Sequence, residues 1–102
     1  MAITQRPVRT GSTASIGTSE VVLIPASPLH ARARRGVQVY ADADNTGTVY
    51  VGLTGLTAAV TGAATDGFPI LAGKSVVVPI KRVGDLFCRA DTGTNKVSWM
   101  II

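Results

Sequence analysis

Few residues of this chain have the types and spacing that enzyme chemistry needs. His30 is the one histidine, and no cysteine or acidic cluster stands at metal-ligand spacing beside it. Neither a zinc site nor a Ser-His-Asp triad can therefore be built around it. The chain also lacks a phosphate-binding glycine loop and a paired-glutamate signature. The sequence predicts a protein that is not an enzyme and that holds no cofactor or metal.

Oxygen-bearing side chains in Asp42-Ala-Asp-Asn-Thr-Gly47 are spaced like those of a calcium-binding loop. Such a loop needs a bidentate glutamate at its twelfth position, and Leu53 stands there instead. The flanking residues also have the pattern of strands, whereas the calcium loop joins two helices. We expect a turn, because Asn, Asp and Gly tolerate left-handed backbone. An adventitious cation is the alternative.

Cys88 is the single cysteine, which excludes an internal disulfide framework. Alternation along its β-run places it on the same face as Leu86 and Ala90. We therefore expect a small buried apolar residue at this position. An intersubunit disulfide or a reactive thiol is the alternative.

Length and composition indicate one domain with a modest core. The chain has 102 residues, of which 46% are hydrophobic and 16% are charged, so it is too apolar for a disordered protein. The low charge suggests that part of the surface is covered in the working state. The apolar runs are much shorter than a membrane span, and the N-terminus lacks the apolar stretch of a signal peptide. We expect synthesis in the cytoplasm and no membrane partner.

Positive charge is concentrated in the first third of the chain. The formal net charge is +4; residues 1–35 hold five arginines and one glutamate, while residues 36–102 hold equal numbers of basic and acidic residues. Arginine suits bidentate contact with carboxylate or phosphate. Plain solvated charge and an acidic protein surface both fit this pattern. Both are favoured over nucleic acid, because no aromatic side chains for base stacking are interleaved with the arginines. The candidate partner-binding arginines are Arg6, Arg9, Arg32, Arg34 and Arg35.

Short β-runs separated by Gly-, Asn-, Asp- and Thr-rich turns make up most of the chain. They predict an all-β fold, a small antiparallel β-sandwich or barrel of jelly-roll-like or Greek-key type. Residues 20–102 are expected to form this single domain, and the Thr-, Ser- and Gly-rich residues 1–19 an extended N-terminal arm. The expected strands are 20–24, 29–41, 48–51, 75–80, 85–91 and 96–102, with a weaker one near 56–60.

The run 29–41 alternates so that His30, Arg32 and Arg34 share one face, which predicts an arginine ladder facing outward. Gly36 is a possible bulge where the register shifts. With the turn at 42–47 and the strand 48–51, this run predicts a hairpin. Its two tyrosines, Tyr40 and Tyr50, flank the turn, where they could pair, and one of them is a candidate interface residue.

The residues between Gly52 and Gly67 are small and show no clean period. So long an irregular connection is unusual in a small domain and tends to be an interaction loop. Phe87 and Trp99 are expected in the core. The apolar terminal strand 96–102 is expected to pair inside the sheet.

Three stretches are similar to small virion proteins of tailed bacteriophages, in which a G-x-V-Y-V-G turn precedes a G-F-P-L-x-A-G hairpin. They are Asn45-Thr-Gly-Thr-Val-Tyr-Val-Gly52, the run from Gly67-Phe-Pro-Ile-Leu-Ala-Gly73 to Ile80, and Asp85-Leu-Phe-Cys-Arg-Ala-Asp91. The resemblance covers residues 37–102. It lies in the pattern of strands and turns, and it assigns no functional site.

This resemblance implies a structural protein of the virion, assembled in the host cytoplasm. The most natural role is a decoration or cement protein that binds and stabilises the capsid exterior. Such proteins are oligomers, often trimers, whose N-terminal arms reach neighbours. Expected partners are the major capsid protein or other virion subunits.

Other functions remain open at this point. The chain could be a tail, neck or fibre component of the same particle. It could also be a carbohydrate- or receptor-binding β-module, which would need Tyr40, Tyr50 or Trp99 as an exposed aromatic platform. A single-stranded nucleic-acid binder is a third possibility, in which affinity would depend steeply on salt.

Overall fold

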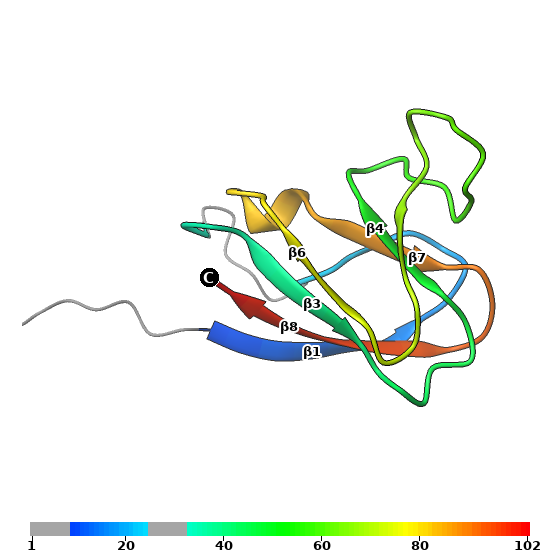
Figure 1. Cartoon of the computed structure of the whole chain (residues 1–102), viewed down its shortest axis with the longest axis horizontal. Helices are drawn as coiled ribbons and strands as arrows, with labels where there is room; N and C mark the ends of the chain where they lie inside the picture. Colours follow the sequence, from blue (N-terminus) through cyan, green and yellow to red (C-terminus); the bar gives the residue numbers. More distant parts are fainter. Residues whose placement is uncertain (1–8, 25–32) are drawn as a thin grey trace, which may run out of the picture.

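The computed structural model describes residues 9–24 and 33–102, which form two four-stranded antiparallel sheets packed face to face (Figure 1). The prediction of a small antiparallel β-sandwich is therefore confirmed. The elements are β1 (Arg9–Ile16), β2 (Val21–Val22), β3 (Val37–Ala41), β4 (Val49–Gly52), β5 (Phe68–Ile70), β6 (Ser75–Val78), a single 3-10 turn η1 (Val83–Asp85), β7 (Phe87–Ala90) and β8 (Asn95–Ile101).

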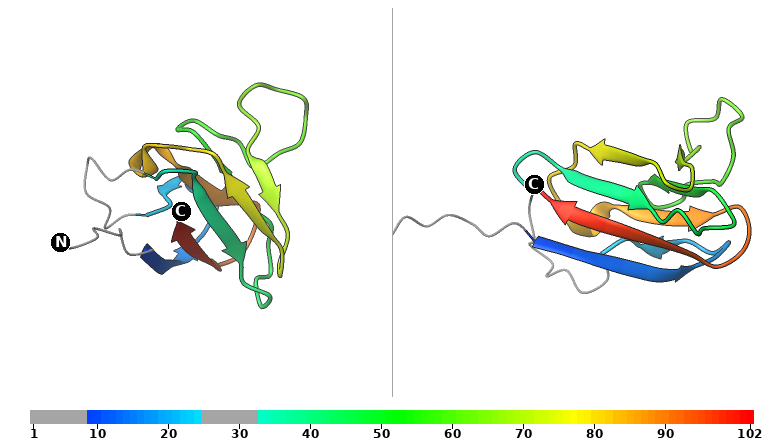
Figure 2. Two further views of the ribbon diagram at one scale, coloured as in Figure 1. Left: turned by 60° about the vertical axis from the view of Figure 1, so that its left-hand side comes forward. Right: turned by 60° about the horizontal axis from the view of Figure 1, so that its bottom comes forward.

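The order of the strands is that of a jelly roll. The first sheet has the order β1-β8-β3-β6 and the second sheet the order β2-β7-β4-β5. The antiparallel pairs β1–β8, β2–β7, β3–β6 and β4–β5 are nested in sequence, as if one long hairpin had been rolled into two layers. In the right-hand view of Figure 2, the four strands of the first sheet lie side by side in the order β6, β3, β8 and β1.

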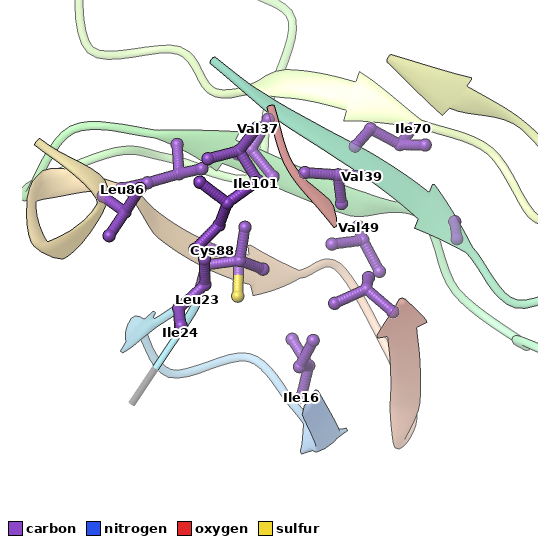
Figure 3. Close-up of a cluster of buried hydrophobic side chains, with 14 of the residues drawn as sticks. Ile16, Leu23, Ile24, Val37, Val39, Val49, Ile70, Leu86, Cys88 and Ile101 are labelled. Carbon is purple, nitrogen blue, oxygen red and sulfur yellow. The ribbon is translucent and has the colours of Figure 1, made fainter. Parts of the chain in front are cut away.

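The core lies between the sheets and consists mainly of β-branched residues. Val37, Val39 and Ala41 alternate along β3 with their side chains fully buried, while the residues between them point outward. On β4, Val49 (Figure 3) and Val51 are buried in the same core. The expectation that the terminal strand pairs inside a sheet is confirmed, because β8 lies between β1 and β3.

The predicted hairpin over residues 37–51 is wrong, because β3 and β4 belong to different sheets. The turn after β3 is attached to β8 instead. The Asn45 side chain accepts a hydrogen bond from the Lys96 backbone N–H at 2.8 Å and donates one to the Lys96 carbonyl at 2.9 Å. The partners of β3 are β6 and β8, and those of β4 are β5 and β7, so a local turn signal did not identify the pairing.

Tyr40 and Tyr50 consequently do not pair across the turn. Tyr40 lies in register with serines of β6 and β8 in the first sheet. Tyr50 lies opposite Arg89 of β7 in the second sheet. The two side chains belong to different surfaces of the sandwich.

The strand predicted over 29–41 is shorter than expected. Residues 29–32 lie outside the described residues, and Arg34 and Arg35 occupy a bend, so Arg34 does not stand on a strand ladder. Gly36 precedes the strand and is not a bulge within it. Its φ is +148°, and a Cβ there would lie 2.1 Å from the Val78 carbonyl oxygen, so only glycine fits.

Part of the expected arm belongs to the sandwich. β1 pairs with β8 from Arg9↔Ile101 to Thr13↔Val97, and the register shifts before Ile16, whose side chain is fully buried. Residues 9–16 are therefore an edge strand of the first sheet. Residues 1–8 of the expected arm lie outside the described residues.

Smaller differences concern the lengths of elements. The strand expected at 20–24 is limited to Val21–Val22, and that expected at 75–80 ends at Val78. Residues 56–60 lie in a loop, in which an isolated β-bridge joins Thr57 to Asp66.

Among residues 9–24 and 33–102 no helix is long and apolar enough to cross a bilayer.

Candidate interaction surfaces

Basic residues from two distant segments lie at one end of the first sheet. Val37 at the start of β3 lies opposite Val78 at the end of β6. The residues that precede Val37 and those that follow Val78 therefore lie at the same end of the sheet. The Ala33 N–H donates to the Lys81 carbonyl at 2.8 Å, and the Lys81 ammonium donates to the Arg34 carbonyl at 3.2 Å. We call the four exposed residues at this position the basic end: Arg34, Arg35, Lys81 and Arg82.

The charges of the basic end are uncompensated within the described part of the chain. Among the described residues, the one ion pair joins Lys96 to Asp42 at 3.3 Å, and it lies at the opposite end of β3 and β8. Asp85 is the nearest acidic residue in sequence, and its carboxylate forms no ion pair with any described residue. The basic end therefore presents a cluster of like charges to solvent.

The structure brings together only some of the predicted arginines. Arg34 and Arg35 lie in the basic end, and the backbone of Arg9 pairs with Ile101 at the same end of the first sheet. Arg6 and Arg32 lie outside the described residues, as does His30. Lys81 and Arg82 were missed, because the equal numbers of acids and bases in residues 36–102 hid where they lie. The Lys-Arg pair directly after an apolar strand was the available signal.

The two candidate tyrosines differ in exposure. Tyr40 is 39% exposed on the outer face of the first sheet, between uncharged neighbours. Tyr50 is only 9% exposed, and Gly67 at the end of the loop after β4 lies against it. A Cβ at Gly67 would lie 2.7 Å from the Cβ of Tyr50, so glycine is needed for this close approach. Tyr40 is accessible to a partner and Tyr50 is not.

The loop of residues 53–67 is organised around one carboxylate. Asp66 accepts hydrogen bonds from the Thr61 and Gly62 backbone N–H groups at 2.6 and 2.8 Å, and from the hydroxyls of Thr61 and Thr57. The Thr61 N–H is the largest cause of the lowered pKa of Asp66. The loop projects beyond the second sheet (Figure 1). It leaves Leu53 and Val60 exposed.

The start of this loop is tied to the sandwich by two charged residues. Glu20 accepts hydrogen bonds from the Thr54 hydroxyl at 2.8 Å and the Gly55 N–H at 2.6 Å, and these bonds lower its pKa. The Arg89 guanidinium donates to the Leu56 carbonyl at 3.3 Å. Leu56 itself is buried. The expected interaction loop is thus held in place on the outer side of the second sheet.

Cys88 has the environment of a core residue. Its side chain is fully buried among the core residues (Figure 3), and burial raises the pKa of the thiol to about 12. A thiol with so high a pKa stays protonated near neutral pH, and the thiolate is the reactive form. The expectation of a buried apolar residue is confirmed for this position.

Trp99 and Phe87 are only partly buried. Trp99 packs against the core cluster, and its ring lies so close to Gly11 that a Cβ there would approach it to 2.5 Å. The indole N–H donates to the Thr13 hydroxyl at 3.3 Å. The tryptophan is thus covered by β1 and does not form an exposed platform.

Within the described ranges no three His, Cys, Asp or Glu side chains gather as metal ligands would.

No family model, no curated protein and no solved structure matches this chain.

Proposed function

We propose that this chain is a non-enzymatic structural protein of a phage virion, which binds and stabilises the capsid exterior as a decoration or cement protein. The observation that carries the proposal is the basic end, where four exposed cations have no ionic partner among the described residues. Jelly rolls occur in viral capsid proteins and in lectins, so the fold is compatible with this role without requiring it. The resemblance of residues 37–102 to small virion proteins adds support.

In this proposal the partner is the major capsid protein or another virion subunit. The basic end would pair with acidic groups of that partner, with Arg32 as a further candidate. Leu53 and Val60 of the 53–67 loop would supply an apolar contact, since both side chains are exposed and the loop is hydrogen-bonded to Asp66. A homo-oligomer, with a trimer favoured, would carry several basic ends on one oligomer and so raise its avidity for the capsid surface.

Two alternatives belong beside this proposal. A tail, neck or fibre location in the same particle would use the same surfaces. A carbohydrate- or receptor-binding module would need an exposed aromatic platform. Tyr40 and Phe68 are exposed, but they belong to different sheets, and Tyr50 is buried. The charged surface therefore favours a virion partner.

Co-sedimentation with particles tests the proposal. Purified protein would be mixed with particles that lack it and pelleted, at about 0.1 M and about 0.5 M salt. We expect saturable binding that weakens at the higher salt concentration, because surface ion pairs are screened. Binding that never saturates, or no binding at low salt, would reject the capsid role.

A further inference from the structure

We propose that the basic end is one binding site for a carboxylate-rich segment of a protein partner, formed jointly by the segments 34–35 and 81–82. The inference rests on the proposed function for the identity of the partner. It goes further by assigning carboxylate binding to these two segments acting together as one site, a property that can be measured without a particle.

The two segments form one surface because the backbone joins them. The residues before β3 and after β6 are linked by the hydrogen bonds of Ala33 to Lys81 and of Lys81 to Arg34. The Arg35 N–H donates to the Ile102 carbonyl at 2.8 Å, which fixes the bend against the end of β8. The cations are therefore displayed from a fixed backbone, which lowers the ordering cost of binding a partner.

The clustering itself indicates an anionic ligand. Like charges on one end of a small domain repel one another, and that repulsion is relieved when an anion binds. Three of the four cations lack a described hydrogen-bond acceptor, and the fourth, Lys81, has only a carbonyl. By contrast, the other end of the first sheet pairs its Lys96 with Asp42.

Carboxylates fit the site better than a nucleic acid does. A single-stranded nucleic acid is bound by cations together with aromatic rings on which bases stack. Tyr40 stands near the far end of β3, Trp99 is turned toward the core, and Tyr50 is buried. The basic end thus offers the guanidinium groups that carboxylates use, and none of these three rings is available beside it for stacking.

The test measures binding of the full chain to poly-L-glutamate at low salt, with oligothymidylate as the competing class of ligand. The variant Arg34→Glu/Arg82→Glu reverses two charges of the basic end. The control Lys74→Glu/Lys96→Glu makes the same change in net charge elsewhere on the surface. We expect the first variant to bind poly-L-glutamate at least about tenfold more weakly and the control to lose much less. Circular dichroism would verify that both variants are folded.

Two results would overturn the inference. An equal loss in both variants would mean that net charge alone governs binding. Tighter binding of oligothymidylate than of poly-L-glutamate would assign the site to phosphates. This assay needs no particle, so a chain that binds poly-L-glutamate as expected but fails to co-sediment with particles would refute the proposed function and leave the inference intact.

Discussion

Asp66 is a half-buried carboxylate that links several parts of a long polar loop by hydrogen bonds. Its oxygens accept bonds from two successive backbone N–H groups, those of Thr61 and Gly62, and this lowers its pKa. A group whose pKa is lower in the folded state stabilises the fold above its unfolded pKa. That contribution is lost as the pH falls through the folded value. The loop should therefore loosen in acid.

We predict that the amide resonances of Thr61 and Gly62 titrate with a midpoint below the usual carboxyl range of about 4. The replacement Asp66→Asn should remove this titration and broaden the signals of the loop, while the core resonances stay unchanged. Nuclear magnetic resonance spectra recorded from about pH 2 to about pH 6, where carboxyl groups titrate, would measure both effects. A midpoint above the usual range would contradict the anchoring role of Asp66.

Gly36 is a position where one methyl group should be costly. We predict that Gly36→Ala destabilises the protein by about 2 kcal/mol or more, because the added Cβ meets the Val78 carbonyl at a positive φ. Thermal unfolding would report a fall in Tm of roughly 8 °C or more for a domain of this size. The matched control is Gly84→Ala, where a Cβ meets nothing within 4 Å. An equal effect of the two changes would contradict the packing described for Gly36.

At the scale of elements, β1 determines whether the N-terminal region can be removed. We predict that a chain of residues 9–102 keeps its Tm, since every described contact is retained. A chain of residues 20–102 should lose stability and shift its Trp99 emission to the red, because it lacks Gly11, Thr13 and Ile16. Fluorescence and thermal unfolding of the two chains would measure this. Unchanged emission from residues 20–102 would mean that β1 is dispensable, as in the simple arm hypothesis.

The elements also show what could be read from the sequence. The β-branched runs at 37–41 and 75–78 and the apolar terminal strand were predictable, because side-chain type and alternation are local properties. The assignment of β3 and β4 to different sheets was not predictable. It depends on the pairing of β3 with the distant strands β6 and β8, while the turn of Asp, Asn and Gly residues at 42–47 resembles that of a hairpin.

The same limit applies to the candidate surface. Arg34 and Arg35 stood out in the sequence, because the first third holds all the excess charge. Lys81 and Arg82 became part of the surface only through the β3–β6 pair. Counting charges along the chain did not show which ones would be neighbours in the fold.

For the whole molecule, the buried thiol limits how copies could be linked. We predict that the mass in solution, measured by light scattering, is the same with and without a reductant, because Cys88 is buried and its thiol pKa is about 12. A trimer or larger ring would support the assembly role. A mass that falls to half in reductant would show an intersubunit disulfide and contradict the buried position of Cys88.

We propose above all that this protein is a constituent of a virion. Quantitative mass spectrometry of purified particles, produced from the genome that encodes this chain, would test this proposal. We expect the chain at a fixed ratio to the major capsid protein, with many copies per particle, retained through density-gradient purification at low salt. Its absence from particles, while it is abundant in the producing cells, would contradict the claim.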